Sequence, residues 1–174
     1  MNPSESTVAF HVWKNDRDYL GLATLELPDI SYMKETLNGA GLAGEIETPI
    51  LGLTESMQMK FTFTSMDHRA LDTMDWTESI YYECYQALQV GDPATSKRST
   101  EAYRVSFTGR LRNHNLGTWE QGKKHENEQE FEVIRLEIYL QNQEKLVIDK
   151  YNFIHRVNGI DLLAESRSQM GLNA

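Results

Sequence analysis

Residues 57–65 read MQMKFTFTS, and this stretch decides the fold. Methionine or phenylalanine occupies every second position from 57 to 63, and glutamine, lysine or threonine fills the positions between them up to residue 64. Successive side chains of a β-strand point to opposite faces, so the alternation predicts a strand with one buried face and one face in water. Strands of this kind build an antiparallel sheet that packs on one side.

The same period of two continues along the chain. Further strands are predicted over residues 19–27 (ended by Pro28), 30–36, 79–90, 101–112, 130–142 and 145–156. Phe131 and Val133 are out of phase with the apolar residues that follow them, which predicts a β-bulge near 133–134. The polar residues 141–144 are expected to form a hairpin turn.

Two segments have helical features. Residues 67–74 are expected to form one or two turns with Asp67 as the N-cap, and a second helix is expected after an N-cap at Asp161, ending at Gly171. The sequence therefore predicts a single, mainly β domain over residues 1–174. We expect an antiparallel sandwich-like or barrel-like fold with one short internal helix and one C-terminal helix.

Composition excludes several classes of protein. The 174 residues carry a net charge of −9, and residues 1–90 account for all of it, with 5 lysines and arginines against 14 aspartates and glutamates. This balance gives no long-range attraction for nucleic acid or anionic membranes. One cysteine, Cys84, precludes an intramolecular disulfide, and neither a signal peptide nor an apolar run long enough for a membrane anchor is found.

The residues suited to catalysis or metal binding do not form a known motif. The five histidines lack ligand spacing, and the glycines at 39, 41 and 44 match G-x-G-x-x-G without the helix that a dinucleotide site needs. We expect no catalytic residue, no cofactor and no metal. Structural roles are expected instead: Cys84 in the core, a solvated strand face for Glu126, Glu128, Glu130 and Glu132, and core or interface anchoring for Trp13, Trp76 and Trp119.

The edges of such a sheet pose an assembly problem. Edge strands expose unpaired N–H and C=O groups, and the chain has only four prolines with which to protect them. The sheet can close within the chain or across copies in a ring. A Gly-rich arm over residues 37–48 could then reach a neighbouring copy. The residues that we single out for contact between copies are Asn38, Gly39, Gly41, Leu42, Gly44, Glu45 and Glu47.

The C-terminal sequence resembles a known family. Residues 158–172, NGIDLLAESRSQMGL, resemble the ending of phage major tail tube proteins of the FII-like group, which reads roughly G-x-D-x-x-A-E-I-R-x-x-L-G-L. Ser166 and Met170 depart from the aliphatic residues usual in that ending. The N-terminal half agrees in its order: Leu20-Gly21, the Gly-rich residues 38–44, and Gly52 a few residues ahead of the 57–65 strand.

The resemblance implies a structural protein. Six copies would join their sheets into a ring, and rings would stack into a tube inside a contractile sheath, with the 37–48 arm as a contact between rings. The tube would lie in a virion tail assembled in the bacterial host cytoplasm, or in a headless bacteriocin-like particle that passes ions. Implied partners are the sheath, tape measure, baseplate and tail terminator proteins, and DNA that passes without specific binding. An acidic channel wall, drawn mostly from the first half of the chain, is expected to repel DNA.

Two other functions fit the same sequence features. The first is the tube of a secretion-type contractile injection system, which carries protein effectors and would be distinguished by its genomic neighbours. The second is a monomeric β-barrel that binds a small ligand or sugar with its tryptophans and long loops. Sedimentation at rising concentration separates this second alternative from a tube, because a monomeric binding protein does not form long particles.

Overall fold

The computed structural model describes residues 4–15, 18–39 and 43–172. Its strands are β1 (Ser4–Lys14), β2 (Asp18–Tyr19), β3 (Thr24–Glu26), β4 (Tyr32–Leu37), β5 (Ile46–Thr54), β6 (Gln58–Phe63), β7 (Ile80–Gly91), β8 (Arg98–Asn115), β9 (Asn127–Leu140), β10 (Gln143–Asp149), β11 (Ile154–Val157) and β12 (Ile160–Asp161). The helices are α1 (His68–Asp72) and α2 (Ala164–Gln169).

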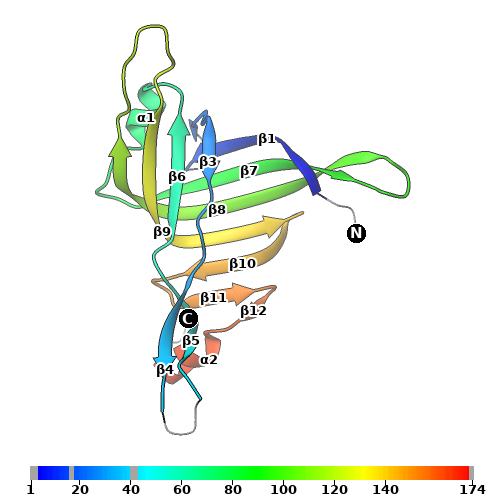
Figure 1. The fold of residues 1–174 in the computed structure, drawn as a ribbon, viewed down its shortest axis with the longest axis vertical. Helices are drawn as coiled ribbons and strands as arrows, with labels where there is room; N and C mark the ends of the chain where they lie inside the picture. Colours follow the sequence, from blue (N-terminus) through cyan, green and yellow to red (C-terminus); the bar gives the residue numbers. More distant parts are fainter. Residues whose placement is uncertain (1–3, 16–17, 40–42, 173–174) are drawn as a thin grey trace.

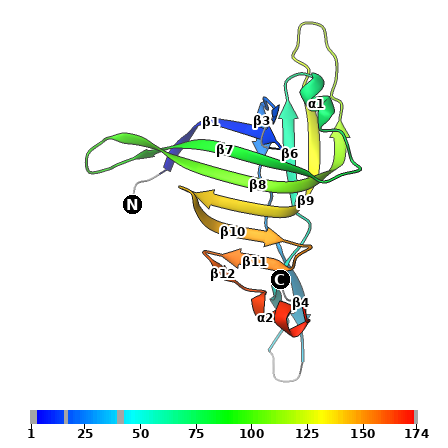
Figure 2. The ribbon, with the colours of Figure 1, turned by 180° about the vertical axis from the view of Figure 1, so that it is seen from behind.

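One antiparallel sheet of ten strands forms most of the molecule (Figure 1). Eight strands follow the order β12-β11-β10-β9-β8-β7-β1-β2, and β6 joins them by pairing with β9 and carries β3 on its other side. The remaining strands, β4 and β5, form a separate two-stranded hairpin that protrudes from one end of the molecule (Figures 1 and 2). The mainly antiparallel β fold predicted from the sequence is confirmed.

The large sheet folds over itself because β9 is bent. Thr108 pairs with Arg135 and the next residue, Gly109, pairs with Val133, so Ile134 is the extra residue of a β-bulge. The part of β9 before the bulge pairs with β6, and the part after it pairs with β10. The bulge predicted near 133–134 thus marks the place where one strand passes between the two layers.

The core lies between these two layers. Met57, Met59, Phe61 and Phe63 are all buried, as their alternation predicts. The ring of Phe61 has three further aromatic rings around it, with centroids at 4.8 to 5.8 Å; they belong to Tyr82, Phe107 and Phe131. An aromatic cluster of this kind gains from tilted and edge-to-face contacts in addition to the burial of apolar area.

Two predictions about strands need correction, and strands β1 and β5 were not predicted. The segment 19–27 is two short strands, because Gly21 turns the backbone at a φ of +65° between them. The segment 145–156 is two strands, β10 and β11, joined by a turn in which Asp149 accepts hydrogen bonds from the backbone and side chain of Asn152. Strand β1 was not predicted, because residues 4–9 show no alternation of apolar and polar side chains. In the structure these residues are all exposed.

One helix matches its prediction and the other begins later than expected. Helix α1 has Asp67 as its N-cap, which accepts hydrogen bonds from the backbone N–H groups of Arg69 and Ala70 at 3.0 and 3.2 Å. Helix α2 has Leu163 at the N-cap position, so Asp161 is not its cap. Asp161 lies in β12 and pairs instead with Arg167 at 2.7 Å.

We expect the Asp161–Arg167 pair to make stability depend on pH. Burial would raise the pKa of Asp161, but hydrogen bonds from Arg167 and the backbone outweigh it and hold the pKa below its usual value. A lowered carboxyl pKa stabilises the fold above the unfolded-state value, and this contribution is lost as the pH falls through the folded-state value. Asp161→Asn is therefore expected to lower the free energy of unfolding at pH 7 by about 1–3 kcal/mol.

Urea unfolding of both proteins at a series of pH values measures this effect. The difference between wild type and Asp161→Asn should shrink below about pH 4, where the carboxyl also protonates in the unfolded chain. A difference that stays constant down to the lowest pH at which both proteins fold would contradict the charge-based explanation.

Candidate assembly surfaces

The described residues hold no group of three or more potential metal ligands among His, Cys, Asp and Glu. Neither helix in the described ranges has the length and hydropathy that crossing a bilayer requires. Cys84 is a core residue, and burial raises the pKa of its thiol to about 12, so it is not a reactive thiolate at neutral pH. Trp76 and Trp119 are 70 % and 83 % exposed. Of the two roles expected for them, core and interface anchoring, the core role is therefore wrong for both.

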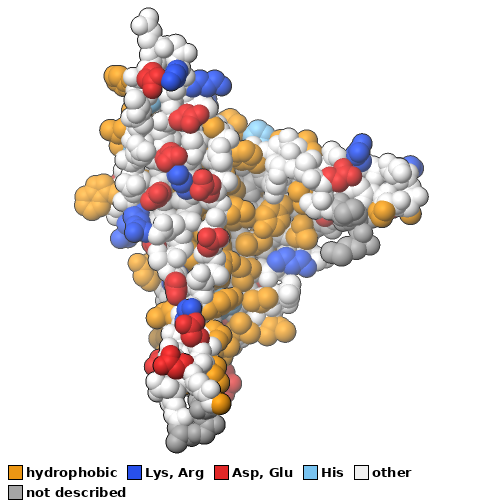
Figure 3. All heavy atoms as spheres, in the orientation of Figure 1, with side chains coloured by type: hydrophobic (Ala, Val, Ile, Leu, Met, Phe, Trp, Pro, Cys, Tyr) orange, Lys and Arg blue, Asp and Glu red, His pale blue; other side chains and the backbone are white. Residues whose placement is uncertain are grey.

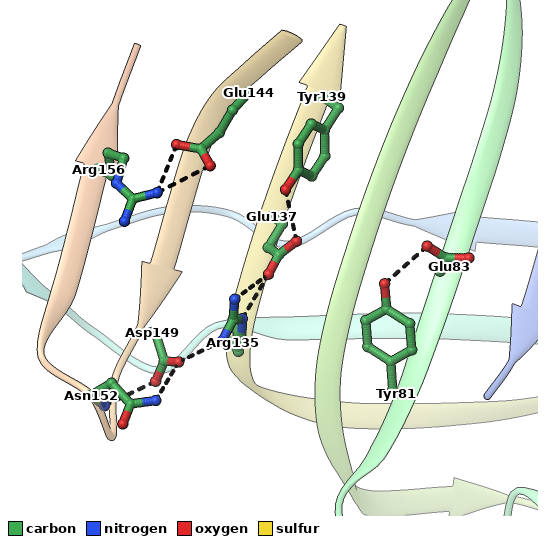
Figure 4. A network of polar contacts seen from close by, with 9 residues as sticks. All are labelled: Tyr81, Glu83, Arg135, Glu137, Tyr139, Glu144, Asp149, Asn152 and Arg156. Carbon is green, nitrogen blue, oxygen red and sulfur yellow. Dashed lines mark hydrogen bonds and ion pairs between the residues drawn. The ribbon is translucent and has the colours of Figure 1, made fainter. Parts of the chain in front are cut away.

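The two faces of the main sheet differ in chemistry. One face packs on the core, and the opposite face, which we call the polar face, carries ion pairs and tyrosines (Figure 4). Glu83, Ser106 and Glu137 lie directly opposite one another on β7, β8 and β9, which places them in one row on this face. The side chains of Arg135 and Arg156 remain 44 % and 37 % exposed, so water reaches the polar face.

Two arginines on the polar face join carboxylates across neighbouring strands. Arg135 contacts Glu137 at 2.5 Å and Asp149 at 3.2 Å. Arg156 of β11 donates to both carboxylate oxygens of Glu144, each at 3.2 Å. Shared contacts of this kind fix the side chains as well as neutralising charge.

Glu83 is the centre of a second group on the same face. Its two oxygens accept hydrogen bonds from the hydroxyls of Tyr81 and Tyr85, each at 2.9 Å, and Arg104 lies 3.4 Å away. Burial, together with the hydrogen bond to Glu83, raises the pKa of Tyr81 to about 12, so Tyr81 remains a donor at neutral pH. Arg104 also stacks over the ring of Tyr139, 4.2 Å from its centroid. The sequence alone did not indicate this network, because its members come from strands far apart in the chain.

One border of the main sheet is open. In the described part of the chain, β2 pairs with β1 only at Trp13 and Lys14, so the outer edge of β1 from Ser4 to His11 has no strand beside it. This stretch contains no proline and no lysine, the residues that commonly protect an edge. The opposite border ends in β12, which has two residues. The open edge of β1 can therefore accept a strand from another chain.

The predicted arm over residues 37–48 is the tip and adjoining strands of the β4–β5 hairpin. Asn38, Gly39, Gly44 and Glu45 are exposed there, and the structure brings them together at the tip. Glu47 lies within β5 and forms an ion pair with Lys34 of β4 at 2.6 Å. The other two residues singled out for contact, Gly41 and Leu42, fall outside the described residues.

The base of the hairpin is fixed to the main sheet by a buried histidine. His155 of β11 is fully buried, and its Nδ1 donates to the carbonyl oxygen of Gly52 at 3.2 Å, while its Nε2 lies 3.5 Å from the hydroxyl of Tyr32. Gly52 has a φ of +68°, and a Cβ there would lie 2.6 Å from the side chain of Leu163. The base is thus packed, whereas the distal half of the hairpin projects into solvent.

The profile of the family described as phage tail tube protein FII matches residues 5–171, nearly the whole chain. The chain belongs to this family of tail tube proteins. The tail tube protein of Escherichia phage P2 is 25 % identical over 177 residues, which is 93 % of this chain and 94 % of that protein. The resemblance seen in residues 158–172 is confirmed over nearly the full length.

Solved structures with the same fold come from contractile systems. The chain aligns with a subunit of the sheath-tube complex of the extracellular contractile injection system PVC with a TM-score of 0.52 and 11 % identity, covering 75 % of this chain and 88 % of that one. A chain of the anti-feeding prophage baseplate gives a TM-score of 0.50 and 8 % identity, covering 80 % and 99 %. These structures share the tail tube fold with this member of the family.

Proposed function

We propose that six copies of this tail tube protein join edge to edge into a ring, and that rings stack into the hollow tube of a contractile phage tail. The open edge of β1 carries the proposal, because an unprotected edge of this length pairs readily with a strand of a neighbouring copy. Closing the ring would cover the edge of β1 in every copy at once. The hairpin tip at residues 37–48 provides the contact between rings.

The polar face of the main sheet is proposed to line the channel. Its network contains four carboxylates (Glu83, Glu137, Glu144 and Asp149) and three guanidinium groups (Arg104, Arg135 and Arg156). The excess of one carboxylate per copy, repeated around a ring, gives a weakly acidic wall that does not bind phosphates. With this face inward, the three carboxylates from the second half of the chain are balanced by the three arginines, so the excess negative charge of the network is that of Glu83, in the first half.

The family and its structural relatives also support a proposal for what passes through the channel and for which proteins bind the tube. DNA passage fits the relationship to the tail tube protein of phage P2, and protein effectors or ions are the alternatives for an injection system or a headless particle. The similar structures are those of a sheath-tube complex, a sheath/tube terminator and a baseplate. We propose the corresponding sheath, terminator and baseplate proteins, and a tape measure protein, as partners of this chain in a virion tail.

Negative-stain electron microscopy of the purified protein at rising concentration tests the proposal. We expect hollow rings with sixfold symmetry, and tubes made of stacked rings. A protein that sediments as a single copy at every concentration, and that is missing from purified tail particles, would contradict it.

The charge of the channel wall leads to a separate prediction. Glu83→Gln with Glu137→Gln removes two of the four carboxylates, so tubes of this variant should retain short DNA duplexes at low salt, whereas wild-type tubes should not. The matched control is Glu26→Gln with Glu130→Gln, which changes the net charge equally at two residues that flank Lys60 of β6, away from the polar face. An electrophoretic mobility assay at two salt concentrations measures retention. Equal binding by both variants would contradict the assignment of the polar face to the channel.

A further inference from the structure

The projecting half of the β4–β5 hairpin carries one exposed apolar pair near its end, on a face that continues with Glu35 opposite Thr48. Leu37 of β4 lies opposite Ile46 of β5, and the next pair, Thr36 opposite Glu47, points to the other face. That other face also carries the ion pair between Lys34 and Glu47. Leu37 and Ile46, which we call the tip pair, are 47 % and 49 % exposed.

Nothing in the described part of the chain covers the tip pair. The described contacts of the hairpin with the main sheet are at its base, through Tyr32, Gly52 and Thr54 near β11. A two-stranded hairpin is marginally stable in water unless its apolar face packs on another surface. The described residues of this copy therefore supply no partner for the tip pair.

A groove of matching chemistry lies elsewhere on the molecule. It opens between β3 and the core-side face of β1, β7 and β8, has a volume of about 300 Å³, and is lined mainly by apolar side chains; these include Phe10, Leu25, Leu27, Cys84, Tyr103 and Val105. Figure 3 shows hydrophobic side chains gathered over the part of the main sheet that β3 and β6 leave uncovered. Leu27, on the rim of the groove, is 47 % exposed.

We propose that the tip pair of one copy inserts into this groove of a neighbouring copy, an inference that rests on the proposed function and names the partner of the hairpin. A cavity of about 150 Å³ accepts one benzene-sized molecule, so a groove of about 300 Å³ has room for roughly two aliphatic side chains. The hairpin projects away from β1, β3, β7 and β8, so a copy does not fill its own groove (Figure 2). The two copies contribute different surfaces to this contact, the tip pair of one and the groove of the other. A heterologous contact of this kind propagates from copy to copy.

Engineered cysteines test the contact directly. Leu37→Cys combined with Leu27→Cys places one thiol on the tip pair and one on the rim of the groove. The variants carry Cys84→Ala as well, because the natural Cys84 lines the groove and could pair with an inserted thiol. Oxidation of assembled tubes should give a ladder of covalently linked oligomers on a denaturing gel. Thr36→Cys with Leu27→Cys is the matched control, since Thr36 is the neighbouring residue on the opposite face of the hairpin, and it should give little or no ladder.

The outcomes separate this inference from the proposed function. Tubes that form without a ladder, or with equal ladders in both variants, would overturn the insertion of the tip pair and leave the tube function intact. Wild-type protein provides a second measurement that needs no substitution. Hydrogen exchange should slow on assembly both in the hairpin and in residues 23–27, and slowing in the hairpin alone would equally overturn the inference. Absence of any assembly would contradict the proposed function instead.

Discussion

Shortening residues 38–44 to a two-residue Asn-Gly turn is expected to leave the subunit folded and to abolish the tubes. The replaced residues that the structure describes are exposed, and the hairpin tip contributes nothing to the core around Phe61. A two-residue turn of this type matches the twist of the flanking strands, so β4 and β5 should still pair. What the variant would lose, under the proposed function, is the contact of the tip with the next ring.

Urea unfolding of the soluble subunit and electron microscopy of concentrated protein measure the two halves of this prediction. The free energy of unfolding should stay within about 0.5 kcal/mol of wild type, as for other surface changes. A substitution of the same residues by an unrelated flexible sequence of equal length controls for length and composition. Normal tubes from the shortened variant would show that the loop has no part in stacking, whatever the fate of Leu37 and Ile46.

Phe61→Ala is expected to cause the largest loss of subunit stability, about 3–5 kcal/mol. Phe61 is fully buried and its ring contacts those of Tyr82, Phe107 and Phe131, which join β6 to the main sheet. The truncated side chain leaves a cavity that four strands cannot close without moving. Since a subunit of this size has a stability of only about 5–15 kcal/mol, a substantial fraction of the variant would unfold on mild heating.

The control for Phe61→Ala is Thr62→Ala, the next residue, which points to the opposite face of β6 and is partly exposed. We expect a change below about 1 kcal/mol for this control. Denaturant unfolding of both variants, followed by tryptophan fluorescence, decides the comparison. Similar losses for the two residues would contradict the assignment of Phe61 to the centre of the core.

Local patterns were sufficient to predict most of the large sheet. The alternation in residues 57–65 and 79–90 predicted which side chains are buried, since burial on one face of a strand is what the alternation encodes. The change of phase at Phe131 and Val133 predicted the bulge, because an extra residue moves the apolar side chains to the other face. The hairpin turn at Gln141 and Asn142 also follows from local sequence, and both residues adopt a positive φ.

The errors occur where local pattern and tertiary contact disagree. Strand β1 pairs with β7 for most of its length although its first residues are exposed, so its strand state depends on its neighbour and not on amphipathicity. The apolar residues of 145–156 continue through a turn that depends on the contacts of Asp149 with Asn152. Asp161 has the features of an N-cap, but the N-cap position is Leu163; Asp161 instead pairs with Arg167 and accepts a hydrogen bond from the backbone N–H of Leu163 at 3.1 Å.

The amino-acid sequence by itself determined the fold class and which face of each long strand is buried. Through the order of its motifs it also indicated the tail tube family. Each of these depends on residues close together in the chain or on their order. Tertiary structure alone decided that the edge of β1 is open, that ion pairs join Arg135 and Arg156 to carboxylates across strands, and that the tip pair and the apolar groove lie apart on one subunit. Such features depend on which distant segments become neighbours. Strand register and the bend at Ile134 set those neighbours, and the register of one strand on another is fixed by packing of the whole core.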